Sequence, residues 1–309
     1  MIPIKYTQSR SVKIIIIGLL ATLLVGSNPI RVSLAQGSLG TQTKPVEASS
    51  PNYPTGVTTS SACPLDIYIL IDLTGSFEAD VATLNEQAPT IVSTILADNP
   101  NTRFGLGWFQ DYGYDPYGAY TDKPYVRVVD LTFDSMALFT DMAGLAIGYG
   151  GDYPESQVPA LYQSVTGAGD GIYIPSGQQA NFRSEAAKVI VLWTDAPFHR
   201  VYGAIPGATP PTYDQAVAAL QALSRTQVLG ISSDGGGLAD LRDITADTGS
   251  LAPARGVDCD QDGSVDILAG EPLVCIIAFD GAGITEAFTA LVETVVDCRT
   301  QLPIILKQP

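Results

Sequence analysis

Short apolar segments alternate along this chain with longer segments in which apolar residues recur every three or four positions. The first pair shows the pattern clearly. Leu65 to Asp72 is almost wholly apolar, as in a strand buried on both faces, and Phe77 to Ala97 carries its apolar residues at helical spacing. The polar residues between them form a short loop, so this part of the chain is predicted to begin as strand, loop and helix.

The same alternation continues along the chain. Further strands are expected at 103–109, 126–131, 189–193, 227–231 and 273–279, and helices at 135–146, 213–223, 238–246 and 284–296. The Tyr- and Gly-rich stretch 112–125 is expected to be a loop whose aromatic residues serve either a contact surface or loop packing. Apolar strands that alternate with helices predict an α/β fold of the Rossmann-like, doubly wound type, a mostly parallel sheet with helices on both faces.

Oxygen-bearing side chains follow several of these strands, at the edge where ligands bind in such sheets. They are Asp72, Thr74, Ser76, Glu155 and Asp195. Gly75 is expected to permit a tight turn that directs the two hydroxyl groups inward. Carboxylates and hydroxyls without His or Cys suit hard cations such as Mg²⁺, Mn²⁺ or Ca²⁺. The alternative is that Asp72 caps a strand and that Thr74 or Ser76 caps the next helix.

Four sequence blocks, in order along the chain, carry a resemblance to a known family. They are CPLDIYILIDLTGSF at 63–77, RFGLG at 103–107 with Phe109 and Asp111, GDYPE at 151–155, and TDAPFH at 194–199. Together they resemble the integrin β-subunit I-like domain, which is a von Willebrand factor A-type (VWA) domain with a metal-ion-dependent adhesion site.

The resemblance implies roles for individual residues. Asp72, Thr74, Ser76, Glu155 and Asp195 match the ligands of the adhesion-site metal, Mg²⁺ or Mn²⁺. Asp111, Asp152, the carbonyl of Pro154 and Glu155 match a neighbouring Ca²⁺ site, although Gly150 stands where the family has Asn. Asp80 matches one of two aspartates of a third site, and Ala79 replaces the other. For Asp111 and Asp152 the alternative is that both are solvated loop acids. His199, the sole histidine, is expected to serve loop packing.

A second cation loop is predicted near the end of the chain. Acidic residues and a serine at alternate positions around Gly263 resemble an EF-hand-like Ca²⁺ loop; they are Asp258, Asp260, Asp262, Ser264 and Asp266. Ala269 stands where such a loop has its last Glu, and Glu271 follows two residues later. The alternative is an acidic surface loop held only by a disulfide.

The four cysteines are expected to form disulfides, because the beginning of the chain predicts export. Sequence alone permits three pairings. Position favours Cys63–Cys298, which joins the two ends of the domain, and Cys259–Cys275, which brackets an insert at 256–275. Four free buried thiols are the alternative.

Basic residues followed by an apolar run and by small residues at 33–35 predict a signal peptide over 1–35, with a retained membrane anchor as the alternative. Residues 36–62 have the composition of a disordered linker, 63–300 are assigned to one domain, and 301–309 to a tail. The expected location is secreted, cell-surface or periplasmic, without a membrane span in the mature form.

The net charge of the chain argues against two classes of binding partner. The chain carries 32 acidic and 16 basic residues, a formal net charge of −16, and loss of residues 1–35 with four basic residues makes it −20. Such a surface repels phosphate groups, so neither nucleic acid nor an anionic membrane is an expected partner. The predicted function is a non-enzymatic adhesion or protein-binding module whose metal captures an Asp or Glu of a protein partner. The alternatives are a metal-dependent hydrolase and a Ca²⁺-binding structural component of a surface or matrix.

Overall fold

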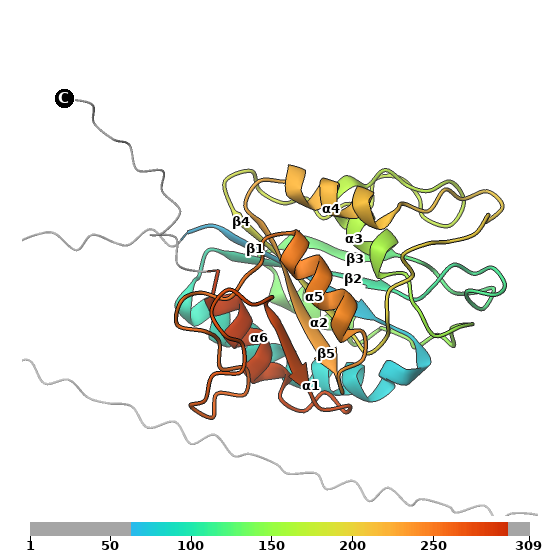
Figure 1. Cartoon of the computed structure of the whole chain (residues 1–309). Helices are drawn as coiled ribbons and strands as arrows, with labels where there is room; N and C mark the ends of the chain where they lie inside the picture. Colours follow the sequence, from blue (N-terminus) through green and yellow to red (C-terminus); the bar gives the residue numbers. More distant parts are fainter. Residues whose placement is uncertain (1–62, 296–309) are drawn as a thin grey trace, which may run out of the picture. The chain divides into compact units, whose positions relative to one another are not determined.

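The computed structural model describes residues 63–295. The predicted signal peptide, linker and tail, together with Cys298, lie outside the described residues. Six strands form one sheet in the order β3-β2-β1-β4-β5-β6 (Figure 1). Their bounds are β1 Leu65–Asp72, β2 Thr102–Phe109, β3 Val126–Thr132, β4 Ala187–Thr194, β5 Thr226–Ser233 and β6 Val274–Ile277. All neighbouring strands are parallel except β2 and β3, which are antiparallel. The predicted fold class is confirmed.

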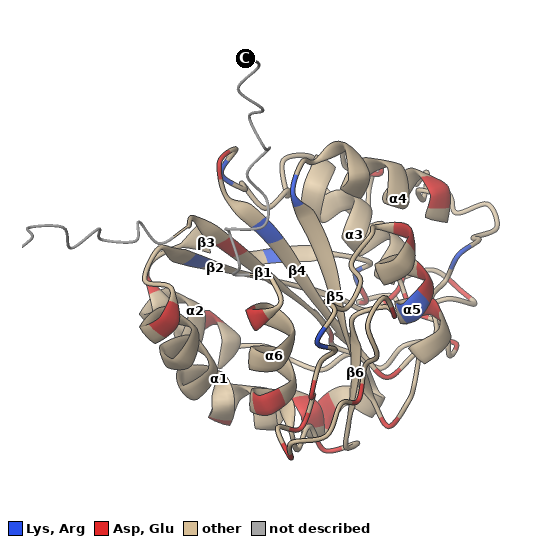
Figure 2. Ribbon diagram, turned by 60° about the vertical axis from the view of Figure 1, so that its left-hand side comes forward, with Lys and Arg blue, Asp and Glu red and all other residues tan. Residues whose placement is uncertain are grey.

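Helices cover both faces of the sheet (Figure 2). After a 3-10 turn at Gly75–Phe77 they are α1 Glu78–Asp98, α2 Ser135–Met142, α3 Gln157–Thr166, α4 Tyr213–Ala222, α5 Leu238–Asp247 and α6 Ile284–Glu293. Apolar residues of α1, α2 and α6 share one hydrophobic cluster, and those of α3, α4 and α5 share another.

Alternation along β1 explains why two cores form. Ile67, Ile69 and Ile71 face the cluster with α1, whereas Tyr68 and Leu70 face the opposite cluster. Side chains of a strand point to alternate faces, so a continuous apolar strand must be covered on both sides. The uninterrupted apolar run of β1 therefore places it in the centre of the sheet.

Several predicted elements are longer than the observed ones, including the last helix, which was expected over 284–296 and covers Ile284–Glu293. The helix expected over 135–146 ends at Met142, just before Gly144, since glycine is a poor helix former. The last strand covers Val274–Ile277 rather than 273–279, and the chain then turns through Gly281, which has a φ of +75°. None of the helices within 63–295 has the length and apolar character needed to cross a membrane.

Ion pairs stabilise the beginning of the domain, and a disulfide stabilises the part near its end. At the amino end of β1, the buried carboxylate of Asp66 accepts hydrogen bonds from Arg103 (2.7 and 2.9 Å) and from Arg183 (2.9 Å to Nε). Near the end of the described chain, Cys259 and Cys275 form the predicted disulfide, which ties the acidic insert to β6. The predicted Cys63–Cys298 bond involves a residue outside the described range and stays a prediction.

Candidate functional site

The sheet brings the candidate ligands together where the strand order reverses. From β1 the chain proceeds to β2 and β3 on one side, whereas β4, β5 and β6 lie on the other. Asp72 is the last residue of β1 and Thr194 the last residue of β4, the two strands that meet at this reversal. Loops that leave the carboxyl ends of two such strands diverge and leave room for a ligand.

Hydrogen bonds join these two strand ends directly. The Thr74 hydroxyl donates to Asp72 Oδ1 (2.7 Å), and the Thr194 hydroxyl donates to Asp72 Oδ2 (2.7 Å). Ser76 forms a side-chain hydrogen bond with Asp195. Since the Thr74 hydroxyl donates its proton to Asp72, its oxygen lone pairs can bind a cation. The Thr194 oxygen, in contrast, already accepts hydrogen bonds from Gln157 Nε2 (3.0 Å) and from the Ala196 amide (3.1 Å).

Glu155 enters this site from the loop before α3. A short parallel bridge pairs it with the segment after β4: the Glu155 amide donates to Pro197, and the His199 amide donates to the Glu155 carbonyl (2.7 Å). Glu155 is 4% exposed, and its Oε2 has no hydrogen-bond partner among the described residues. Asp195 is 8% exposed, and its Oδ1 also has no partner there.

Burial raises the pKa values of all three carboxylates, and neighbouring charges add to the rise for Glu155 and Asp72. Burial, then the charges of Asp72 and Asp111, raise the pKa of Glu155 to about 11. Burial raises the pKa of Asp72 to about 7, against hydrogen bonds from Thr74 and Thr194, and the charge of Asp195 adds to the rise. Burial also raises the pKa of Asp195, against its hydrogen bond with Ser76. Salt bridges within 63–295 do not involve any of these three carboxylates.

Two glycines of the site act differently from each other. Gly75 was expected to permit a tight turn, but its φ lies outside the left-handed region, and an added Cβ would meet only Gly148 O at 3.5 Å, an ordinary contact. The turn therefore does not require a glycine at this position. Gly150, in contrast, has a φ of +64°, and an added Cβ would lie 3.3 Å from Glu155 Oε1. Gly150 therefore lets the loop pass close to the Glu155 carboxylate.

A second group of candidate ligands lies beside Glu155. Asp111, Asp152 and His199 offer ligand atoms that all lie within 4.8 Å of one another. His199 Nδ1 is 2.8 Å from Asp111 Oδ2, and His199 Nε2 is 3.7 Å from Asp152 Oδ2. Burial lowers the pKa of His199, but the hydrogen bond and the charge of Asp111 outweigh it, so the net shift is upward. Reasoning from the sequence missed this position of His199, although it ends the TDAPFH block.

The remaining predicted ligands lie apart from this group. Asp80 is fully buried at the beginning of α1, where one oxygen accepts a hydrogen bond from Ser233 and the other has no partner among the described residues. Burial raises the pKa of Asp80 to about 7. In the insert, ligand atoms of Asp258, Asp260 and Asp262 lie within 4.8 Å of one another, with the latter two side chains exposed.

The Tyr-rich loop contains both packed and exposed tyrosines. Tyr112 is fully buried and packs edge to face with Tyr173 and Tyr202, whereas Tyr120 is 93% exposed. Near the carboxylates, Tyr149 and Tyr153 are also exposed, and the Tyr153 hydroxyl lies 3.3 Å from the Asp195 carbonyl oxygen.

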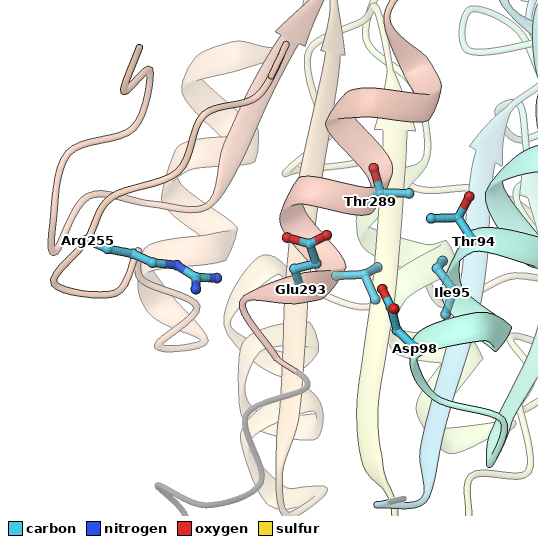
Figure 3. Close-up of a pocket in the computed structure, with 7 residues that line it drawn as sticks. Thr94, Ile95, Asp98, Arg255, Thr289 and Glu293 are labelled. Carbon is cyan, nitrogen blue, oxygen red and sulfur yellow. The ribbon is translucent and has the colours of Figure 1, made fainter. Parts of the chain in front are cut away.

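A separate cavity of about 340 Å³ lies between the carboxyl ends of α1 and α6 (Figure 3). Its lining includes Thr94, Asp98, Thr289 and Glu293, and Arg255 extends towards Glu293 from the opposite side. Sixteen residues of helix separate Glu78 from Thr94, roughly 24 Å at the rise of an α-helix. This cavity is thus remote from the carboxylate site at the amino end of α1.

Comparison with known families identifies the domain. The model of the integrin beta chain VWA domain matches residues 60–217, which include all four sequence blocks and every residue of the carboxylate site. The chain belongs to the integrin β-chain VWA domain family. The insert with Asp258 lies beyond the residues that this family model matches.

One VWA domain among the solved structures is similar to this chain. The crystal structure of the SpRpn10 VWA domain is 12% identical to this chain, with a TM-score of 0.41, and the alignment covers 71% of this chain and 93% of that one. No curated protein matches the chain.

Proposed function

We propose that this integrin β-like VWA domain is a metal-dependent binding module, not an enzyme. Asp72, Thr74, Ser76, Glu155 and Asp195 hold Mg²⁺ or Mn²⁺, and an open position of the ion binds a carboxylate of a protein partner. VWA domains of this family are protein-interaction modules, and oxygen donors are the ligands that Mg²⁺ and Mn²⁺ prefer.

One observation carries this proposal: Asp72, Glu155 and Asp195 are buried without a salt-bridge partner among the described residues, and the charge of Asp195 acts on Asp72 as that of Asp72 acts on Glu155. Burial of an unpaired charge is costly unless it coordinates a metal or loses its charge. Glu155 Oε2 and Asp195 Oδ1 are buried without a partner among the described residues. A divalent cation would satisfy both oxygens and remove the repulsion that raises the pKa values of Asp72 and Glu155.

The surroundings of the carboxylates support a protein partner. Tyr149 and Tyr153 are 91% and 64% exposed, and the hydrogen bond of Tyr153 to the Asp195 carbonyl places it at the site. Exposed tyrosines are typical of protein interfaces, because one end of the ring is apolar and the other forms hydrogen bonds. The partner's acidic group would bind the ion, and these rings would contact its neighbours.

The location of the protein is proposed on separate grounds. We propose that the domain acts outside the cytoplasm, after removal of residues 1–35. The Cys259–Cys275 disulfide supports this, since such bonds persist in oxidising compartments. In the same proposal, Asp111, Asp152, the Pro154 carbonyl and Glu155 hold a second cation, and the 258–266 loop holds Ca²⁺.

A pull-down tests the binding mechanism. The immobilised domain, in Mg²⁺, should retain a partner from the extracellular fraction of its source, and EDTA should release it. The Asp72→Ala variant should retain none, whereas Asp141→Ala, an exposed acid on α2, should behave as wild type. Replacing the partner's contacting Asp or Glu by its amide should abolish binding. Retention that persists in EDTA would refute the proposal.

A further inference from the structure

The sheet ends in β6, which has a neighbouring strand on only one side within residues 63–295 (Figure 2). The carbonyls of Leu273 and Ile277 accept hydrogen bonds from amides of β5 and of the residue that follows it (2.9 Å each). Backbone groups of successive residues point to opposite sides of a strand, so the N–H and C=O of Ile276 point away from β5. The backbone of Ile276 is thus placed to pair with an added strand.

A groove of about 400 Å³ is lined by this strand together with α5 and the insert. Val274 and Ile276 line it from β6, and because they lie two positions apart they share one face of the strand. Val274 is buried, whereas Ile276 is 51% exposed. An extended segment on the open side of β6 would therefore cover an aliphatic side chain as well as backbone groups.

The two sides of the groove carry opposite charges. On the insert side lie three exposed acids, Asp260, Asp266 and Glu271. The 258–266 loop contains four aspartates, more negative charge than one Ca²⁺ neutralises, so this side stays acidic when the proposed ion is bound. On the α5 side lies Arg242, which is exposed and takes part in none of the salt bridges among the described residues.

These charges distinguish between the candidate occupants of the groove. A second copy of this chain, with a formal net charge of −16, would bring further negative charge to an acidic surface. A segment with basic side chains is attracted instead, since complementary charges speed association and exclude wrong partners. Arg242 repels a basic side chain on the α5 side, so the basic group of the occupant belongs on the insert side.

We propose that β6 binds an extended, basic segment of a partner protein as an added strand, with an aliphatic side chain against Ile276 and a basic side chain at the insert. Backbone hydrogen bonds to Ile276 supply affinity, and the side chains supply specificity, as in other cases of strand addition. β5 separates β6 from β1 and β4, which carry the carboxylate site, so this inference does not depend on the proposed metal-dependent function.

A synthetic peptide tests the proposal. The probe is fluorescein-labelled Thr-Lys-Ile-Val-Ile-Lys-Thr, and fluorescence anisotropy measures its binding to the full chain in about 0.15 M salt, which screens long-range attraction between charges. A matched peptide has the same side chains but N-methyl groups on alternate amides, which prevent strand pairing. It should bind on the order of tenfold more weakly, the effect of losing one or two backbone hydrogen bonds. A peptide with Glu in place of Lys should also bind more weakly.

Two variants of Ile276 locate the binding surface. Ile276→Pro removes an N–H that points away from β5, and it should abolish binding because proline cannot donate a hydrogen bond to an added strand. Ile276→Lys, at an exposed position, keeps the backbone intact and should abolish binding by repelling the lysines of the probe. This second variant serves if the proline variant does not fold.

Charge changes on the two sides of the groove should act in opposite directions. Glu271→Lys should weaken binding of the Lys peptide and Arg242→Glu should strengthen it, each by roughly two- to fivefold, the size of one exposed ion pair. The matched controls are Glu86→Lys on α1 and Arg255→Glu, which change exposed residues outside the groove and should leave the affinity nearly unchanged.

Three results would overturn the inference. They are equal binding of the Lys peptides with and without N-methyl groups, wild-type affinity in Ile276→Lys, and a dimer in sedimentation that Ile276→Lys dissociates, which would make a second copy the occupant.

Discussion

At the scale of single residues, the candidate site depends on carboxylates that are buried without a positively charged partner among the described residues. Asp72 can be assigned from the sequence because it ends an apolar strand, and the other predicted ligands Thr74 and Ser76 follow it closely along the chain. The position of His199 could not be assigned, because it depends on a bridge between Glu155 and Phe198 that no local pattern records. Long-range pairings of this kind decide which loop residues meet.

The first prediction concerns the division of labour between two aspartates. Asp72→Ala should abolish Mg²⁺ binding at the first site, because Asp72 holds both Thr74 and Thr194 in place. Asp111→Ala should leave most of the Mg²⁺ affinity intact, because Asp111 contacts His199 and Tyr202 instead. Calorimetric titration with Mg²⁺ measures both. Equal losses in the two variants would contradict the assignment, and Asp141→Ala is the matched exposed control.

The second prediction concerns acid stability and Asp66. Burial alone would raise the pKa of Asp66, but the hydrogen bonds from Arg103 and Arg183 hold it below its ordinary value of 3.8. A lowered folded-state pKa means that the unfolded chain binds more protons, so this contribution is present above pH 3.8 and is lost as pH falls through the lower folded-state value.

Asp66→Asn should accordingly cost about 3–5 kcal/mol at pH 7, because it removes the buried charge that pairs with both Arg103 and Arg183. Its free energy of unfolding should also fall less steeply than that of wild type between pH 4 and pH 2. Urea denaturation at several pH values measures both slopes. Parallel slopes would show that the Asp66 ion pairs do not govern acid unfolding.

At the scale of elements, the hydrophobic pattern predicts the strands well. The prediction for β1 matches the observed strand at both ends, since a strand buried on both faces is apolar throughout. Helix α3 could not be bounded from the sequence, because residues 157–166 are mostly buried and mix polar with apolar side chains. Gln157 in this helix is buried because it donates to the Thr194 hydroxyl, a contact that only the folded sheet creates.

The third prediction concerns the disulfide that ties the insert to β6. Cys259 and Cys275 are separated by 16 positions. Loop closure of that size in the unfolded chain stabilises the folded state by about 3 kcal/mol in the chain-entropy model. The Cys259→Ser, Cys275→Ser double variant should lose about that amount in chemical denaturation. An unchanged free energy of unfolding would mean that the insert contributes nothing to global stability.

The fourth prediction concerns Ca²⁺ at the same insert. If the 258–266 loop binds Ca²⁺ only when folded, the ion should raise the melting temperature of the wild type. Asp260→Ala should remove that rise with little change of the melting temperature in EDTA, because Asp260 is exposed and its carboxylate accepts a hydrogen bond from the Asp262 amide of the same loop. Thermal scans with and without Ca²⁺ compare the two proteins. Identical Ca²⁺ responses would favour an acidic surface loop without an ion.

At the scale of the whole molecule, the sheet divides into two halves that meet at β1 and β4. The order of strands was not predicted, since the hydrophobic pattern records which segments are strands but not which strands are neighbours. Only the reversal of strand order brings the Thr194 hydroxyl to Asp72 across 122 positions of sequence. The carboxylate site is therefore a property of the assembled sheet and not of either half.

That topology has a consequence for the kinetics of folding. A cation that needs ligands from both strand ends cannot bind until β4 has paired with β1. Contacts between residues far apart in the sequence form late in folding, so the ion should bind late. Binding of Mg²⁺ should then slow unfolding and leave the refolding rate nearly unchanged, because interactions that form after the transition state act on the unfolding rate. Stopped-flow measurements in Mg²⁺ and in EDTA would test this, and a Mg²⁺-accelerated refolding phase would contradict it. Mg²⁺ would thus stabilise the domain only after it has folded. Its removal would shorten the lifetime of the folded domain without hindering its formation.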